Sequence, residues 1–263
     1  MTEAQISFTD GKAYERMMGR WSRVVGKQFL RWLDVGKGLQ WLDVGCGNGA
    51  FTEEIIAQCA PASVMGIDPS EAQIAYARTR SATAMAQFRV GDAQVLPYAD
   101  ASVDVAAMAL VIAFVPDPAK AVAEMARVVR PGGWAAAYMW DLPAGGLPLR
   151  PVFAALKSMG MTAPFPPSHE ISRQEALQDL WDSAGFVDVA TRVIRITVEF
   201  ESLDDFWDSN VVPIGPQGKI IAEMSSSAKD VLRDRLRDQL PIGPDGRIAY
   251  EAFSNAVMGR VPG

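Results

Sequence analysis

The chain of 263 residues has little of the chemistry that metal sites and disulfide frameworks use. It contains one histidine, His169, and two cysteines, Cys46 and Cys59. Neither cysteine stands in a paired or metal-ligand spacing, which argues against a zinc-bound or disulfide-stapled fold. Sparse cysteines are typical of a reducing compartment, so we expect a cytoplasmic protein that holds no metal.

Positive charge and long apolar runs are also scarce. The net charge is −6 and the sequence pI is about 4.9, so we expect no nucleic-acid partner. The first ten residues, MTEAQISFTD, lack the basic and apolar regions of a signal peptide. The longest apolar run, 105–115, is too short to span a membrane as a helix and favours a buried strand.

The chain does contain a regular alternation of strand and helix patterns. Strands are expected at 41–44, 63–68, 86–92, 103–110 and 134–140. The segments between them have apolar residues at helical spacing, and Pro131-Gly132-Gly133 is expected to stop the last of these helices. This alternation predicts an α/β fold, a parallel sheet with helices on both faces.

Three glycines stand within five positions in WLDVGCGNGAF, residues 41–51. Glycine permits positive φ angles and leaves free the space that a Cβ atom would fill. The following helix presents unpaired N–H groups, and ligands of open parallel sheets bind at the carboxyl ends of strands. The pattern favours a ligand lying across Gly45 and Gly47, with a bare strand-to-helix turn as the alternative.

Acidic residues end the next two expected strands. Asp68 is placed to accept two ribose hydroxyls, and Asp92, after a glycine, could receive the exocyclic amine of adenine. Each alone also fits a polar strand end or a helix cap. Together with the glycines they indicate a nucleoside-shaped site. A dinucleotide fold usually has Gly-x-Gly-x-x-Gly, whereas position 50 here is Ala.

Four segments carry a family resemblance: LDVGCGNGAF, GIDPS, VGDAQVLPYADASVDVAAMALVIAFVPDP and EMARVVRPGGW. They resemble the successive motifs of class I S-adenosylmethionine-dependent methyltransferases, of the small-molecule type related to quinone-biosynthesis C-methyltransferases. The resemblance covers roughly residues 12–141, and the C-terminal half matches only in layout. It implies a Rossmann-like, mostly parallel sheet of seven strands, the last one antiparallel, and a helical lid.

We interpret the whole chain, 1–263, as a single methyltransferase domain. Lid helices are expected in 1–36, the cofactor-binding core in 37–141, and a C-terminal part in 142–263 with a helical insertion near 203–238. A sixth strand is expected at 193–200 and the last at 247–257. Two similar segments, VPIGPQGKII and LPIGPDGRIA, are interpreted as repeated turn chemistry.

The resemblance implies S-adenosyl-L-methionine as cofactor and a set of contacts to it. The residues are Tyr14, Arg20, Gly45, Gly47, Asp68, Asp92, Ala93, Ala109 and Leu110. Gly45 and Gly47 would approach the methionine part, and Asp68 the ribose. Asp92 and the backbone of Ala93 would hold adenine, and Ala109 and Leu110 would lie beside the methyl group. Tyr14 and Arg20 would fold over the site, with Arg20 near the cofactor carboxylate.

Methyl transfer needs a general base only where the acceptor must lose a proton. Asp141, after the fifth strand, and His169 are weak candidates for that role. Phe114, Trp140 and Trp207 could wall an apolar acceptor pocket, with core packing as the alternative. Many relatives have a polar residue at the position of Phe114, so its presence removes an obvious candidate base.

The sequence therefore predicts methyl transfer to a small, apolar or aromatic molecule by in-line displacement. A module that binds the cofactor without catalysis and a nicotinamide-dependent oxidoreductase are the alternatives. The sequence leaves open the acceptor atom (carbon, oxygen or nitrogen) and the oligomeric state.

Overall fold

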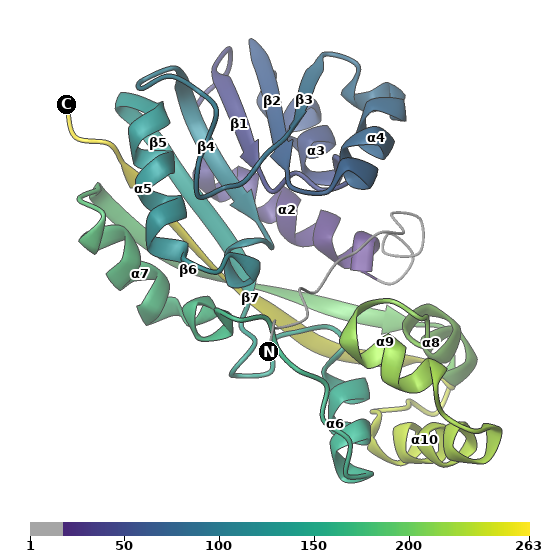
Figure 1. Cartoon of the computed structure of the whole chain (residues 1–263). Helices are drawn as coiled ribbons and strands as arrows, with labels where there is room; N and C mark the ends of the chain where they lie inside the picture. The colour runs from purple at the N-terminus through teal and green to yellow at the C-terminus, as the bar shows by residue number, and fades with distance from the viewer. Residues whose placement is uncertain (1–17) are drawn as a thin grey trace.

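The computed structural model describes residues 18–263 and has a seven-stranded sheet at its centre (Figure 1). The strand order is β3-β2-β1-β4-β5-β7-β6, and β7 runs antiparallel to both of its neighbours. The strands are β1 (Gln40–Val44), β2 (Ser63–Asp68), β3 (Ala86–Val90), β4 (Val103–Ala109), β5 (Val129–Trp140), β6 (Val187–Phe200) and β7 (Ile248–Arg260). This topology confirms the predicted Rossmann-like sheet with an antiparallel last strand.

Helices cover both faces of the sheet, as predicted. The helices of the core are α2 (Arg20–Leu33), α3 (Ala50–Cys59), α4 (Glu71–Thr79), α5 (Pro118–Val128) and α7 (Gln174–Ser183). On one face, Phe29 of α2 packs on Tyr138 of β5, with ring centroids 4.7 Å apart. On the other face, the buried indole of Trp181 in α7 donates to the carbonyl of Ala135 at 3.0 Å. Neighbouring residues of β5 thus serve opposite layers.

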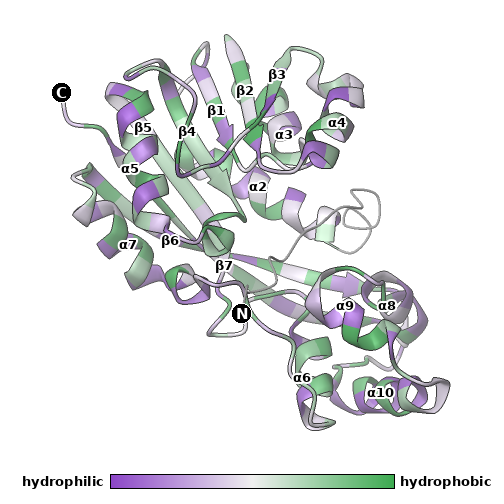
Figure 2. Cartoon of the chain, in the orientation of Figure 1, coloured by the Kyte–Doolittle hydropathy of each residue, from purple (hydrophilic) through white to green (hydrophobic). Residues whose placement is uncertain are grey.

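Burial on both faces explains the apolar composition of the central strands. In β4, five of the seven residues are buried and the other two are partly buried. Figure 2 shows the central strands mainly hydrophobic, while the helices that cover them alternate hydrophobic and hydrophilic residues. No helix within residues 18–263 is long and apolar enough to span a membrane.

The strand β5 starts five residues earlier than predicted. Val129 already pairs with Val103, so the strand runs through Pro131-Gly132-Gly133. The pairing register shifts there, and Gly133 is required because a Cβ atom would lie 2.5 Å from the carbonyl of Asp104. The glycines hold the chain end in place: Gly132 N donates to Val261 O at 2.8 Å and Val261 N to Gly133 O at 2.9 Å. The motif follows the end of α5 at Val128, as expected, and lies within an irregular strand start.

A group of four helices lies beyond one end of the sheet, at the lower right of Figure 1. They are α6 (Arg150–Ser158), α8 (Leu203–Asn210), α9 (Gly215–Ala222) and α10 (Ser226–Gln239). The two similar Pro-Ile-Gly-Pro segments begin with the same tight turn, in which Ile214 N donates to Val212 O at 2.7 Å and Ile242 N donates to Leu240 O at 2.9 Å. The expectation of turn chemistry is therefore correct for the start of both copies. They differ afterwards, because the first continues into α9, whereas in the second Gly243 N donates to Arg247 O at 2.8 Å.

Candidate cofactor and acceptor site

The glycine loop follows β1 and has a positive φ at each of its three glycines, 76° at Gly45, 50° at Gly47 and 81° at Gly49. A Cβ atom on Gly45 would lie 2.5 Å from the side chain of Val111, so this glycine lets the end of β4 approach the loop. A Cβ atom on Gly47 would meet nothing within 4 Å. The backbone of Gly47 is therefore open to a ligand on the outer side of the loop.

Asp68 at the end of β2 holds the glycine loop in place. Its Oδ2 accepts a hydrogen bond from Gly47 N at 2.9 Å, and its Oδ1 accepts one from Ser70 N at 2.9 Å. Burial raises the pKa of the Asp68 carboxyl, and these two backbone N–H groups act in the opposite direction. Each oxygen keeps a second lone pair, so the carboxylate can still accept two hydroxyl groups of a ligand.

A second carboxylate, Asp43, lies in β1 just before the loop, and the sequence analysis did not single it out. It is fully buried, and its Oδ2 accepts a hydrogen bond from Thr52 Oγ1 at 2.6 Å. Its Oδ1 has no hydrogen-bond partner among residues 18–263. Burial raises the pKa of Asp43 to about 7, and the nearby Asp68 acts in the same direction. The only sequence signal was one charged residue inside an otherwise apolar strand.

Asp92 follows β3, which ends at Val90, two residues earlier than predicted. Its Oδ1 accepts a hydrogen bond from Gln94 N at 2.8 Å, and the Gln94 side-chain amide lies 3.2 Å from both carboxylate oxygens. The Oε1 atom of Gln94 accepts from Asp117 N at 3.2 Å. Gln94 thus joins the loops that follow β3 and β4. The sequence analysis missed it because its partner Asp117 is 23 residues away.

The loop after Asp92 is fastened to α5 by an ion pair. Glu124 accepts a hydrogen bond from Leu96 N at 2.7 Å, and Arg127 donates to Leu96 O at 2.9 Å and to Tyr98 O at 2.8 Å. The hydrogen bond from Arg127 holds the pKa of Glu124 below its usual value. These contacts fix the segment that carries Asp92 and Ala93 against the sheet.

We expect Arg127→Ala to lower the free energy of unfolding by about 2 kcal/mol, because several charge-assisted hydrogen bonds are lost. Arg127→Lys keeps the charge but loses the forked geometry of the guanidinium. Its free energy of unfolding should therefore lie between those of the alanine variant and the unchanged protein. Urea unfolding monitored by circular dichroism measures both values. Equal stability of the alanine variant and the unchanged protein would contradict this assignment.

The end of β4 has an unusual backbone. Leu110 has a φ of 62°, in the left-handed region, while its N–H donates to Tyr138 O at 2.9 Å. A non-glycine residue in this conformation costs roughly 1 kcal/mol and persists only where its surroundings hold it. Ala109 and Leu110 are both partly buried, and the short helix η3 (Ile112–Phe114) follows them. Through Val111 this segment contacts the glycine loop, so the two come together as predicted.

Arg20 begins α2 and lies against aromatic rings. Its guanidinium carbon is 4.2 Å from the ring centroid of Trp21 and 4.4 Å from that of Phe200, at the end of β6. Burial lowers the pKa of Arg20, whereas Asp205 and Tyr250 act in the opposite direction. The side chain thus joins α2 to β6. The other residue expected to cover the site, Tyr14, lies outside the described residues.

The structure joins the two candidate bases through one hydrogen-bond network. Asp141 is buried, its Oδ1 accepts from Ala144 N at 2.9 Å, and its Oδ2 accepts from Asn255 Nδ2 at 2.8 Å. The same Asn255 nitrogen donates to Ser172 O at 2.8 Å, and the Ser172 hydroxyl donates to His169 O at 2.6 Å. Asp141 therefore has a clear structural role. It fastens the short helix η4 (His169–Ser172) to the end of β5.

His169 stands on η4, which packs on η3. Ser168 N donates to Ala113 O at 3.0 Å, which fixes this contact beside the end of β4. The imidazole Nδ1 lies 3.1 Å from Pro166 O, which favours the tautomer with a proton on Nδ1 and a free lone pair on Nε2. The ring stacks on Phe165 at a centroid distance of 5.3 Å, and Phe165 stacks on Phe153 of α6 at 5.7 Å.

The aromatic candidates for an acceptor pocket differ in burial. Trp140 is buried, and its indole nitrogen has no hydrogen-bond partner in the part of the chain that the structure describes. Phe114 is partly buried on η3, beside the end of β4. Trp207 of α8 is also partly buried, and the Arg233 guanidinium lies 5.7 Å from its ring centroid. Phe165, 41% exposed, was missed because a single phenylalanine in a Pro-rich loop carries no periodic signal.

The segment that carries the glycine loop, Asp68 and Asp92 is similar to known proteins. A family model described as a methyltransferase domain matches residues 42–137. The chain is 30% identical to the ubiquinone/menaquinone biosynthesis C-methyltransferase UbiE of Geobacter sulfurreducens, over 66% of this chain and 73% of that protein.

Two other relatives match over shorter segments. The chain spans 42% of malonyl-[acyl-carrier protein] O-methyltransferase of Pectobacterium atrosepticum, with 34% identity over 42% of this chain. It spans 30% of an uncharacterized transposon protein of Streptomyces fradiae, with 40% identity over 38% of this chain.

A solved structure shares the fold. Phosphoethanolamine N-methyltransferase 2 of Haemonchus contortus, in complex with S-adenosyl-L-methionine, superposes with a TM-score of 0.59. The identity is 18%, and the match covers 96% of this chain and 56% of that one.

The fold and the relatives define a class I S-adenosylmethionine-dependent methyltransferase. Within that class, the chain belongs to the methyltransferase-domain family that includes the ubiquinone/menaquinone C-methyltransferases. S-adenosyl-L-methionine is the cofactor of this family. The predicted class and cofactor are confirmed, and the alternative of a nicotinamide-dependent oxidoreductase is not supported.

Proposed function

We propose that this protein transfers the methyl group of S-adenosyl-L-methionine to a small, planar, largely apolar molecule. The observation that carries the proposal is the hydrogen bond from Gly47 N to Asp68 Oδ2, which sets an open glycine backbone beside a carboxylate with free lone pairs. These groups fit the cofactor: Asp68 would bind the ribose hydroxyls and Asp92 the adenine amine. Within residues 18–263 the Oδ1 atom of Asp43 has no hydrogen-bond partner, and this carboxyl, once ionised, would place a negative charge under the loop that suits a cationic ligand.

The bound cofactor supplies a methyl group already activated by its sulfonium. The task of the chain is to align the acceptor and to exclude water. Ala109 and Leu110 would border the methyl group, and Phe114 and Phe165 would line the acceptor side next to them. The helices of 203–238 and the start of α2 would close the site as a lid. Arg20 would neutralise the cofactor carboxylate from there.

His169 would take the proton from a methyl acceptor that must ionise before it reacts. The contact with Pro166 O leaves the lone pair on Nε2, the atom that would take the proton. The structural role of Asp141 makes His169 the better candidate. The two relatives that are named for quinone and acyl-carrier-protein substrates differ in acceptor, so the acceptor atom is a matter for experiment.

The test measures the formation of S-adenosylhomocysteine in the presence of three candidate methyl acceptors. They are reduced 1,4-naphthoquinone, a catechol and an aliphatic amine. We expect turnover with a planar hydroxyl-bearing acceptor and none with the amine. His169→Gln should lower the rate at least about tenfold near neutral pH, with unchanged cofactor affinity by calorimetry. Turnover of the amine alone, or an unchanged rate in the glutamine variant, would contradict the proposed acceptor chemistry.

A further inference from the structure

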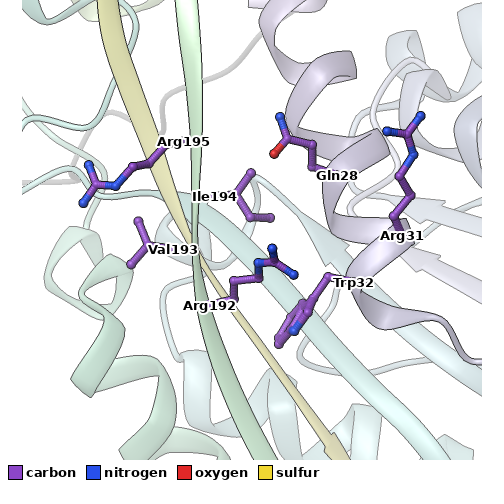
Figure 3. A pocket seen from close by; sticks show the side chains of 7 residues that line it. All are labelled: Gln28, Arg31, Trp32, Arg192, Val193, Ile194 and Arg195. Carbon is purple, nitrogen blue, oxygen red and sulfur yellow. The ribbon is translucent and has the colours of Figure 1, made fainter.

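A hollow of about 490 Å³ opens between α2 and β6, on the face of the sheet that α2 covers. Figure 3 shows its lining side chains. Gln28, Arg31 and Trp32 come from the C-terminal half of α2, and Arg192, Val193, Ile194 and Arg195 come from β6. None of these residues belongs to the loops that follow β1, β2, β3 or β4. The hollow is therefore separate from the cofactor site.

Three arginines line the hollow, and only Arg195 is paired with an acidic side chain within residues 18–263. Arg31 and Arg192 have no ion-pair partner among these residues, although neighbouring cations of α2 do. Arg23 lies 3.6 Å from Glu53, and Lys27 lies 3.8 Å from Glu54. The chain as a whole is acidic, with a net charge of −6. Two guanidinium groups on one hollow repel each other, and a bound anion would remove that repulsion.

The favourable interaction of a cation with a helix C-terminus explains an unpaired arginine at only one of the two positions. Arg31 stands in the last turn of α2, where a cation is favourable next to the helix C-terminus. Arg192 lies on a strand, so this explanation does not apply to it. In Figure 3 its side chain extends toward α2 and Trp32, whereas Arg195, which also lines the hollow, extends away from α2. There Arg195 pairs with Glu251 at 2.5 Å.

The rest of the lining is apolar and aromatic. Trp32 is partly buried, and its ring is held against Phe29 at a centroid distance of 6.2 Å. Ile194, 2% exposed, forms an apolar surface beside it. A fixed aromatic ring next to guanidinium groups suits a planar ring that bears an anionic group. We propose that this hollow binds a small aromatic anion, with its phosphate or carboxylate between Arg31 and Arg192 and its ring against Trp32.

The test is calorimetric titration at low salt with three probes: 1-naphthyl phosphate, inorganic phosphate and 1-naphthol. We expect 1-naphthyl phosphate to bind at least about tenfold more tightly than either of the others, because only it uses both halves of the hollow. The double variant Arg31→Ala/Arg192→Ala should raise its dissociation constant at least about tenfold. Trp32→Leu should remove the preference for 1-naphthyl phosphate over inorganic phosphate.

Arg89→Ala is the matched control, because it removes an exposed arginine from β3, the strand at the opposite edge of the sheet from β6. It should change the dissociation constant by less than about threefold. The proposal is wrong if 1-naphthyl phosphate does not bind, if the control weakens binding as much as the double variant, or if S-adenosylhomocysteine displaces the probe. None of these measurements requires methyl transfer, so the result does not depend on the proposed acceptor.

Discussion

Asp68→Ala is expected to weaken the binding of S-adenosyl-L-methionine and S-adenosylhomocysteine at least about 100-fold. Two charge-assisted hydrogen bonds to ribose hydroxyls contribute about 1.5–3 kcal/mol each, and both would be lost. The same change removes the acceptor for Gly47 N, so the glycine loop would lose its link to β2. Calorimetric titration with the two ligands, and with NADH as a negative control, measures the effect.

Two further variants separate binding from folding. Asp68→Asn keeps one oxygen acceptor, so its affinity should lie between those of the alanine variant and the unchanged protein. Asp188→Ala makes the same chemical change at the exposed start of β6, near Arg260, and should leave the affinity unchanged. An Asp68→Ala protein that unfolds normally in urea and binds within about threefold of the unchanged protein would overturn the assignment of the ribose site.

The parts of the fold that the sequence predicts well are those with local signals. β1, β2 and β4 lie within a residue of their expected bounds, because an apolar run bounded by glycine or aspartate identifies a buried parallel strand. The placement of Asp68 beside the glycine loop is predictable from its position at the carboxyl end of a strand. The start of α5 was predicted as well: Asp117 caps the helix by accepting from Lys120 N at 3.0 Å.

The parts of the fold and of the site that the sequence does not predict depend on contacts with distant residues. β6 begins at Val187, six residues before its expected start, because VDVATR has mixed polarity and lies at the edge of the sheet. It becomes a strand only by pairing with β7, more than 50 residues later. The roles of Gln94 and Arg127 cannot be predicted from the sequence for the same reason, since each contacts a segment 23 to 31 residues away. Local propensity contains no information on such contacts.

The buried Asp43 predicts a specific dependence of stability on pH. In the unfolded chain this carboxyl has the ordinary aspartate pKa of 3.8, whereas in the folded protein the pKa is about 7. Between these values the folded protein binds one more proton than the unfolded chain, so the free energy of unfolding falls as the pH rises. The loss is about 1.4 kcal/mol per pH unit, on the order of 4 kcal/mol over the full interval.

Asp43→Asn isolates this contribution, because asparagine is close in shape and does not titrate. Its unpaired amide lowers stability equally at every pH, so only the slope is informative. We expect the difference in unfolding free energy between Asp43→Asn and the unchanged protein to shift by about 2 kcal/mol in favour of the variant between about pH 5 and about pH 7. Urea unfolding at several pH values measures it, and taking the difference cancels the titration of groups that do not interact with Asp43, such as Glu124.

Thr52→Val provides the second comparison. The Thr52 hydroxyl donates to Asp43 Oδ2 and favours the ionised carboxyl, so its removal should move the pKa of Asp43 still higher. The fall in stability should then extend to a higher pH than in the unchanged protein. A difference between Asp43→Asn and the unchanged protein that stays constant with pH would show that Asp43 is ionised in the folded state. The negative charge beneath the glycine loop would then already be present before any cationic ligand binds.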